Sequence, residues 1–177
     1  MHVLTRNSRI WVPGFSLLLC SVPASSQAPL KHITDGVLGH FIGTWSISGT
    51  TLGKPTTTGA QIQEDFNGSF LEVHIRDPAG KDRYEARVFF GEKQDGGLVV
   101  HWLDGTGAET FQTLGTGSVV GDEVTLTFPY PESTFRDKLT YDAAHDRWRL
   151  FIEMGPLDHP KVFSDWYFDR SRPEHPH

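Results

Sequence analysis

The chain contains nine histidines, a residue type common in metal sites and in acid–base catalysis. His2, His175 and His177 lie near the two ends of the sequence, and the other six are scattered singly between them. A metal site is usually marked by ligands at short, regular spacing, such as H-x-x-x-H or H-x-H. The part of the chain that we expect to fold has no such pair. The sequence therefore predicts no metal site.

Covalent and acid–base catalysis also lack a clear signature. No G-x-S-x-G motif occurs, and the one cysteine, Cys20, lies in an N-terminal segment with the features of a secretory signal. Asp165 and Tyr167 would share one face of a strand and could act as acid and base if that face lined a cavity. The alternation around them favours an outward position. We predict no catalytic residues, and an enzyme stays open as an alternative that depends on whether Asp165, Tyr167 or His101 points inward.

Two glycine-rich stretches, DGTG at 104–107 and GTGSVVGD at 115–122, look like phosphate-binding loops. A phosphate cradle needs a helix N-terminus behind it, and no helical pattern follows either stretch. We therefore predict that both are hairpin turns.

The first residues predict a signal peptide over 1–28. Arg6 and Arg9 precede a mostly apolar run from Ile10 to Cys20, and small residues follow up to a Ser-x-Ala site ending at Ala28. The apolar run is about half the ~20 residues that a permanent membrane helix needs. We expect an exported protein, periplasmic or extracellular, with no stable membrane span.

A lipid-bearing Cys20 is the alternative to simple cleavage, but Leu19 is larger than the residue that normally precedes a lipidated cysteine. Without residues 1–28 the chain would have no cysteine and hence no disulfide. The net charge of −6 disfavours nucleic acid as a partner, because nucleic acid rewards a basic surface. At 177 residues, we expect one folded domain over 29–170 and a frayed tail over 171–177.

The hydrophobic pattern predicts one short helix followed by strands. Val37, Leu38 and Phe41 have helical spacing, although Gly36 and Gly39 weaken the helix. After Gly43 the apolar period becomes two and remains so, which is typical of strands. The expected strands are Trp45–Thr51, Thr57–Phe66, Ser69–Arg76, Arg83–Phe90, Leu98–Leu103, Thr110–Thr116, Val124–Phe128, Thr134–Tyr141, Trp148–Met154 and Val162–Asp169.

The strands ending at Arg76 and beginning at Arg83 allow a prediction of register. A turn centred between Ala79 and Gly80 gives one apolar face, and the next hairpin continues it. The expected pairs are Ile75 with Tyr84, Val73 with Ala86, Leu71 with Val88, then Phe90 with Leu98, Val88 with Val100 and Ala86 with Trp102. On the other face His74 meets Glu85 and Glu72 meets Arg87.

About ten antiparallel strands with short connections would leave exposed edges unless the sheet closes. A short helix followed by an unbroken meander favours closure. We therefore predict an all-β fold, an antiparallel up-and-down barrel of about eight to ten strands with a short N-terminal helix. A barrel of that strand number can hold a small ligand.

Gly43 and Trp45 in GTW, together with Arg170 after the final DWYF, resemble the two ends of a lipocalin-like barrel of the calycin superfamily. In that superfamily a Gly-x-Trp opens the first strand, and an Arg near the end packs across the indole. The likeness is closest to exported lipocalin-like domains of bacteria, with an Asn-Gly turn at Asn67 and a W-x-D hairpin at Trp102. The chain lacks their usual disulfides and the helix after the barrel.

The resemblance implies a binding protein for a small, largely apolar ligand held inside the barrel. Gly43, Trp45 and Arg170 would close the barrel structurally. We predict that the ligand-binding residues are Leu71, Val73, Ile75, Tyr84, Val88, Val100, Trp102 and Trp166, with Phe111 also able to reach the inner face.

Three alternatives stay open. An enzyme acting on a lipophilic metabolite in the same cavity needs a convergent polar cluster. A nitrobindin-like haem carrier needs a histidine aimed inward, but the last strand has none, so no cofactor is expected. A protein-interaction module predicts a filled interior and a large exposed apolar patch.

Overall fold

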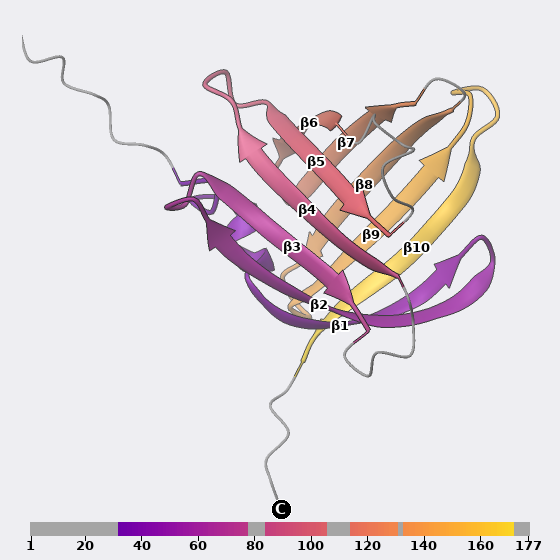
Figure 1. Cartoon of the computed structure of the whole chain (residues 1–177), viewed down its shortest axis with the longest axis horizontal. Coiled ribbons are helices and arrows are strands. Elements are labelled where there is room, and N and C mark those ends of the chain that lie inside the picture. The colour runs from indigo at the N-terminus through magenta and orange to yellow at the C-terminus, as the bar shows by residue number, and fades with distance from the viewer. Residues whose placement is uncertain (1–31, 78–83, 106–113, 131–132, 172–177) are drawn as a thin grey trace, which may run out of the picture.

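The computed structural model describes residues 32–77, 84–105, 114–130 and 133–171. It is all-β, and its ten strands close into one antiparallel barrel (Figure 1). The strands are β1 (Gly43–Thr51), β2 (Lys54–Asp65), β3 (Phe70–Arg76), β4 (Glu85–Glu92), β5 (Leu98–Asp104), β6 (Leu114–Val120), β7 (Glu123–Pro129), β8 (Thr134–Asp142), β9 (Arg147–Met154) and β10 (Lys161–Arg170). The predicted fold class is confirmed.

The expected helix is a single 3-10 segment, η1 (Val37–Phe41). Leu38 and Phe41 are buried, as their spacing indicates. Gly39 lies so close to the carbonyl of Thr34 that a side chain there would collide with it. Glycine at position 39 therefore allows the backbone of η1 to pass close to Thr34.

Each strand pairs with its neighbours along the chain, and β10 pairs with β1 to close the sheet. Figure 1 shows β10 running alongside β1. We use "floor end" for the end where β1 begins and β10 ends, and "rim end" for the opposite end, where β1 ends and β10 begins. The η1 segment lies at the floor end.

The register between β3 and β4 differs from the prediction by two residues. The structure pairs Ile75 with Ala86, Val73 with Val88 and Leu71 with Phe90. The β4–β5 pairing moves likewise, so that Ala86 meets Asp104, Val88 meets Trp102 and Phe90 meets Val100. The pairing differs because the β3–β4 connection is longer than the tight turn that the prediction assumed. A shift of two residues leaves every side chain on its predicted face, since side chains alternate with a period of two.

The same shift changes the charged neighbours on the outer face. Arg76 pairs with Glu85. His74 Nε2 lies 2.6 Å from Glu85 Oε1. Both expected charge pairs therefore form, as diagonal neighbours rather than directly opposed ones.

The prediction was wrong for the stretch GTGSVVGD. Residues Gly115 to Val120 belong to β6, and only Gly121 and Asp122 make the turn before β7. Side chains at Gly115 and Gly117 would collide with Phe128 and with the β7 backbone. The glycines thus allow β7 to pack tightly against β6, and glycine has this role in strands as well as in turns.

The core lies inside the barrel, formed by the alternate residues of each strand that face inward. Its largest fully buried side chains include Trp45, Trp148, Phe41 and Phe168, all at the floor end. No helix among the described residues is long and apolar enough to cross a membrane. The predicted signal peptide over 1–28, Phe111 and all of the predicted tail over 171–177 except Ser171 lie outside the described residues, so the expectations about them stay predictions.

Candidate functional site

The floor end of the barrel is closed by the two residues that the sequence singled out. The guanidinium of Arg170 lies over the indole of Trp45, 4.2 Å from the ring centroid. It also donates to the carbonyl of Ile42 at 3.0 Å and to that of His40 at 3.2 Å. Trp45 Nε1 donates to the carbonyl of Phe41 at 2.8 Å. The contact ties the first strand to the last and to η1.

Gly43 has a backbone φ of 139°, a value that residues with a side chain rarely adopt. A Cβ at this position would also collide with the guanidinium of Arg170. The glycine therefore provides both the turn from η1 into β1 and the space for the arginine. The geometry agrees with the structural role expected for Gly43, Trp45 and Arg170.

The eight predicted ligand-binding residues belong to the interior by register, but they lie at different depths. Six of them, Leu71, Val73, Ile75, Val88, Val100 and Trp166, are buried, with 5% exposure or less. Tyr84 and Trp102 are half-buried at the rim end. Trp102 pairs with Val88 and donates to the phenol of Tyr84 at 3.3 Å, whereas Trp166 lies elsewhere in the barrel wall, on β10. That these residues bind a ligand stays a prediction.

Half-buried aromatic side chains gather at the rim end and pack against the core. We call the set formed by Tyr84, Trp102, Tyr130, Phe135 and Phe163 the aromatic rim. Tyr130 stacks edge-on against Phe135 at 5.3 Å, and Phe135 against Phe163 at 5.1 Å. A register irregularity in β10 between Val162 and Ser164 places Phe163 beside Phe135.

Polar groups of the interior also lie toward the rim end. Thr51 Oγ1 accepts hydrogen bonds from Trp166 Nε1 at 3.0 Å and from Ser164 at 3.2 Å. Thr58 is buried, and its hydroxyl has no hydrogen-bond partner within the described part of the chain. The interior is thus filled by buried apolar side chains at the floor end and is partly polar toward the rim end.

Asp137 is the most unusual of these polar groups. It lies on β8 between Leu126 of β7 and Ile152 of β9, both of which are core residues, so it faces inward. Its side chain is buried, and its Oδ1 has no hydrogen-bond partner among the residues described. Burial raises the pKa of Asp137 from 3.8 to about 7.

Two phenols lie within electrostatic reach of this carboxyl. Burial is the main cause that raises the pKa of Tyr84 far above its ordinary value, and the nearby Asp104 and Asp137 raise it further. Burial and the same two carboxyls also raise the pKa of Tyr130. We call Tyr84, Asp104, Tyr130 and Asp137 the acidic cluster. It lies beside the aromatic rim, which shares both tyrosines.

Sequence reasoning missed Asp137, although a signal for it was present. In the stretch Phe135-Arg136-Asp137-Lys138-Leu139, strict alternation places the aspartate on the same face as Phe135 and Leu139. Two flanking cations, Arg136 and Lys138, made the stretch look like an ordinary exposed strand. The structure shows that both flanking residues belong to the outer face, opposite Glu153 and Phe151.

The three residues that were to decide the enzyme alternative belong to the outer face. Asp165 forms a two-point ion pair with Arg149 at 2.8 and 2.9 Å. The same guanidinium lies 5.6 Å from the ring of Tyr167. His101 is exposed and pairs with Phe89 on the outer face. These residues do not form a polar cluster in the interior, and Asp137 is the group that an enzyme would have available there.

None of the described histidines belongs to the interior. His40 stacks on Tyr141 at 4.7 Å at the floor end, His74 contacts Glu85 on the outer face, and His145 contacts Asp142 in the β8–β9 turn. No group of three or more potential metal ligands occurs among the residues described. The arrangement therefore does not fit a haem held by an interior imidazole.

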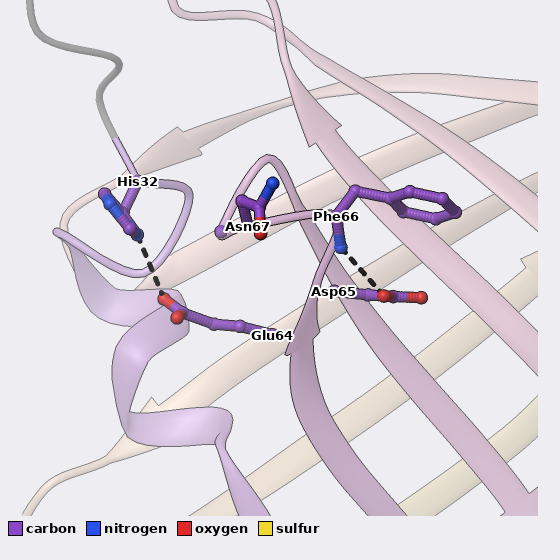
Figure 2. A pocket seen from close by; sticks show the side chains of 6 residues that line it. His32, Glu64, Asp65, Phe66 and Asn67 are labelled. Atoms are coloured by element: carbon purple, nitrogen blue, oxygen red, sulfur yellow. Dashed lines mark hydrogen bonds and ion pairs between the residues drawn. The ribbon is translucent and has the colours of Figure 1, made fainter.

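A separate surface hollow lies beside the β2–β3 turn (Figure 2). His32 Nδ1 lies 3.6 Å from Glu64 Oε1, and the hydroxyl of Thr34 donates to the same carboxylate. Figure 2 shows the ring of Phe66 pointing away from this pair. The polar atoms satisfy one another, and the hollow is open to solvent, so it does not have the form of a binding site.

The chain was also compared with known proteins. A scan against family models matches none, and a search of curated proteins finds no match.

Proposed function

We propose that the protein binds a small, largely apolar ligand in the interior of the barrel, entering from the rim end. The likeness to lipocalin-type barrels belongs to this proposal, and the packing of Arg170 across Trp45 supports it. An antiparallel barrel of ten strands is wide enough for such a ligand, and the floor end is sealed by fully buried aromatic side chains.

The observation that carries the proposal is the aromatic rim. Five large aromatic side chains lie at one end of the barrel and remain half-buried, although burying each ring completely would be favourable by roughly 2 kcal/mol. An apolar ligand at this end would complete their burial. A barrel with a purely structural interior would gain stability from larger neighbouring side chains here, as it does at the floor end.

Titration with N-phenyl-1-naphthylamine tests the proposal, because this probe is neutral and apolar and accepts excitation energy from tryptophan. We expect saturable probe fluorescence with quenching of tryptophan emission at one probe per chain. Trp102→Ala removes a ring of the rim and should weaken the binding about tenfold, as expected for the loss of roughly 1.4 kcal/mol of apolar contact.

Leu103→Ala is the matched control. Leu103 is the next residue of β5, belongs to the outer face and is 50% exposed. This variant should bind the probe like the original chain. The proposal is wrong if binding is not saturable, or if the two variants weaken it equally, since the second result would indicate adsorption to the outer surface.

A further inference from the structure

One oxygen of the buried Asp137 carboxyl, Oδ1, lacks the hydrogen-bond partner that such an atom normally has. Asp137 is 4% exposed, yet its Oδ1 makes no hydrogen bond with any described residue. Buried polar groups are nearly always hydrogen-bonded, and a carboxylate without a partner costs several kcal/mol. A group outside the described residues that satisfies this carboxyl would remove much of that cost.

The surroundings of the carboxyl indicate which kind of partner it takes. The acidic cluster contains a second carboxyl, Asp104, which acts on the same two phenols, Tyr84 and Tyr130. The two cations beside the buried carboxyl on the same strand, Arg136 and Lys138, belong to the outer face, and Arg136 donates to the carbonyl of Gly155 at 3.0 Å. The chemistry of this part of the interior is therefore acidic and aromatic.

We propose that the interior ligand is an amphiphilic amine, whose protonated nitrogen binds the carboxyl of Asp137 while its apolar body lies against the aromatic rim. This inference rests on the proposed function and adds the polar end of the ligand. An ammonium group donates to the carboxylate and is attracted to the faces of the Trp102 and Tyr84 rings. An anionic ligand would be repelled by two carboxyls, and a neutral alcohol would offer one hydrogen bond without charge.

The geometry also gives the inferred site a pH dependence. The titratable groups in electrostatic contact with Asp137 are Tyr84 and Tyr130, and Asp104 acts on both of these. Burial raises the pKa of Asp137 to about 7, so the empty site takes up a proton as the pH falls below neutrality. An ammonium binds the ionised form, so each pH unit below that pKa weakens binding about tenfold.

Three probes with one apolar body test the inference by calorimetric titration: 2-(1-naphthyl)ethylamine, 2-(1-naphthyl)ethanol and 1-naphthylacetate. At pH 8 we expect the amine to bind at least about tenfold more tightly than the alcohol, and the acetate to bind most weakly. Between pH 8 and pH 5 the affinity for the amine should fall about a hundredfold, while that for the alcohol changes little.

The variant Asp137→Asn keeps the shape of the side chain and removes its charge. It should abolish the preference for the amine and its pH dependence but retain binding of the alcohol. Asp165→Asn is the matched control, because it makes the same chemical change at a carboxylate that is paired with Arg149 on the outer face. It should leave the preference unchanged.

The outcomes separate the two proposals. If the alcohol binds as tightly as the amine, or if Asp137→Asn keeps the amine preference, the amine inference is overturned and interior binding stands. If none of the three probes binds, both the inference and the proposed function are overturned. Circular dichroism of each variant establishes that it is folded, and a misfolded Asp137→Asn would be replaced by Asp137→Ser for the same comparison.

Discussion

At the scale of single residues, the most unusual feature of the interior is the buried carboxyl of Asp137, which does not stabilise the fold. The other inward-facing residues at the level of Asp137 on the neighbouring strands are apolar, and a leucine there would fit the pattern of a core strand. Burying a carboxyl lowers the stability of the fold, and the binding role that we propose accounts for its presence. The alternation of β8 could have revealed its direction, but no spacing in the sequence reveals that its Oδ1 lacks a partner.

Replacing Asp137 by Asn should stabilise the ligand-free protein at high pH. The folded chain holds a proton on Asp137 up to about pH 7, whereas an unfolded aspartate releases it near 3.8. The folded state therefore binds more protons between these values, and its stability falls as the pH rises through that window. The rise in pKa corresponds to as much as about 4 kcal/mol.

Urea unfolding at pH 8 and at pH 4 measures this difference. We expect the gain of the Asn variant to be present at pH 8 and to be nearly absent at pH 4, where the aspartate is protonated in the folded state and about half protonated in the unfolded state. An equal gain at the two pH values would contradict the assignment, because it would show that the charge of Asp137 is not the cause.

At the scale of elements, the sequence predicted which side of each strand faces inward more reliably than which residues pair. The apolar period of two identifies the inner face and is unaffected by a shift of two residues, so the β3–β4 pairing could be wrong while the faces were right. Turn length decides the pairing, and loop composition specifies length poorly. Composition is equally ambiguous for β6. Its glycines are typical of a turn, but they lie in the strand, where β7 packs closely against them.

Gly117→Ala tests this account of β6. Its Cβ would overlap the backbone carbonyl of Thr125 and the side chain of Leu126, and a backbone atom cannot move aside as a flexible side chain can. We expect a loss of roughly 1 to 3 kcal/mol in the free energy of unfolding. Gly36→Ala serves as the control, since no atom lies near that position and its φ of −125° suits any residue. Equal stability of the two variants would show that the close approach does not constrain the strand.

At the scale of the whole molecule, a barrel that closes on itself makes its last strand the partner of its first. Trp45 and Arg170 are directly paired in the register, and the guanidinium joins β1, β10 and the backbone before β1. Closure was predictable because the two unpaired edges of an open sheet would be unfavourable. The aromatic rim was only partly predictable, since Phe163 of β10 contacts Phe135 of β8 two strands away, a contact that no local sequence pattern indicates.

Arg170→Ala should loosen this junction. It removes the stacking on Trp45, the hydrogen bonds to the carbonyls of Ile42 and His40 and the ion pair with Asp146, a loss of roughly 1 to 3 kcal/mol. Arg147→Ala is the matched control, because Arg147 is similarly exposed and has an ion pair with Asp169 and an aromatic neighbour, Tyr167. Thermal unfolding should show a clearly lower midpoint for Arg170→Ala. Equal midpoints would show that the junction contributes no more than a surface ion pair.

The pairing of β1 with β10 also sets an order of events for the chain as it is synthesised. Gly43–Thr51 acquires its second partner only after Lys161–Arg170 has left the ribosome, so β1 keeps one unpaired edge until the last strand of the barrel has been translated. Contacts so distant along the chain are slow to form because a long loop must close first. The growing chain therefore has an extended period in which an open sheet edge is available to chaperones.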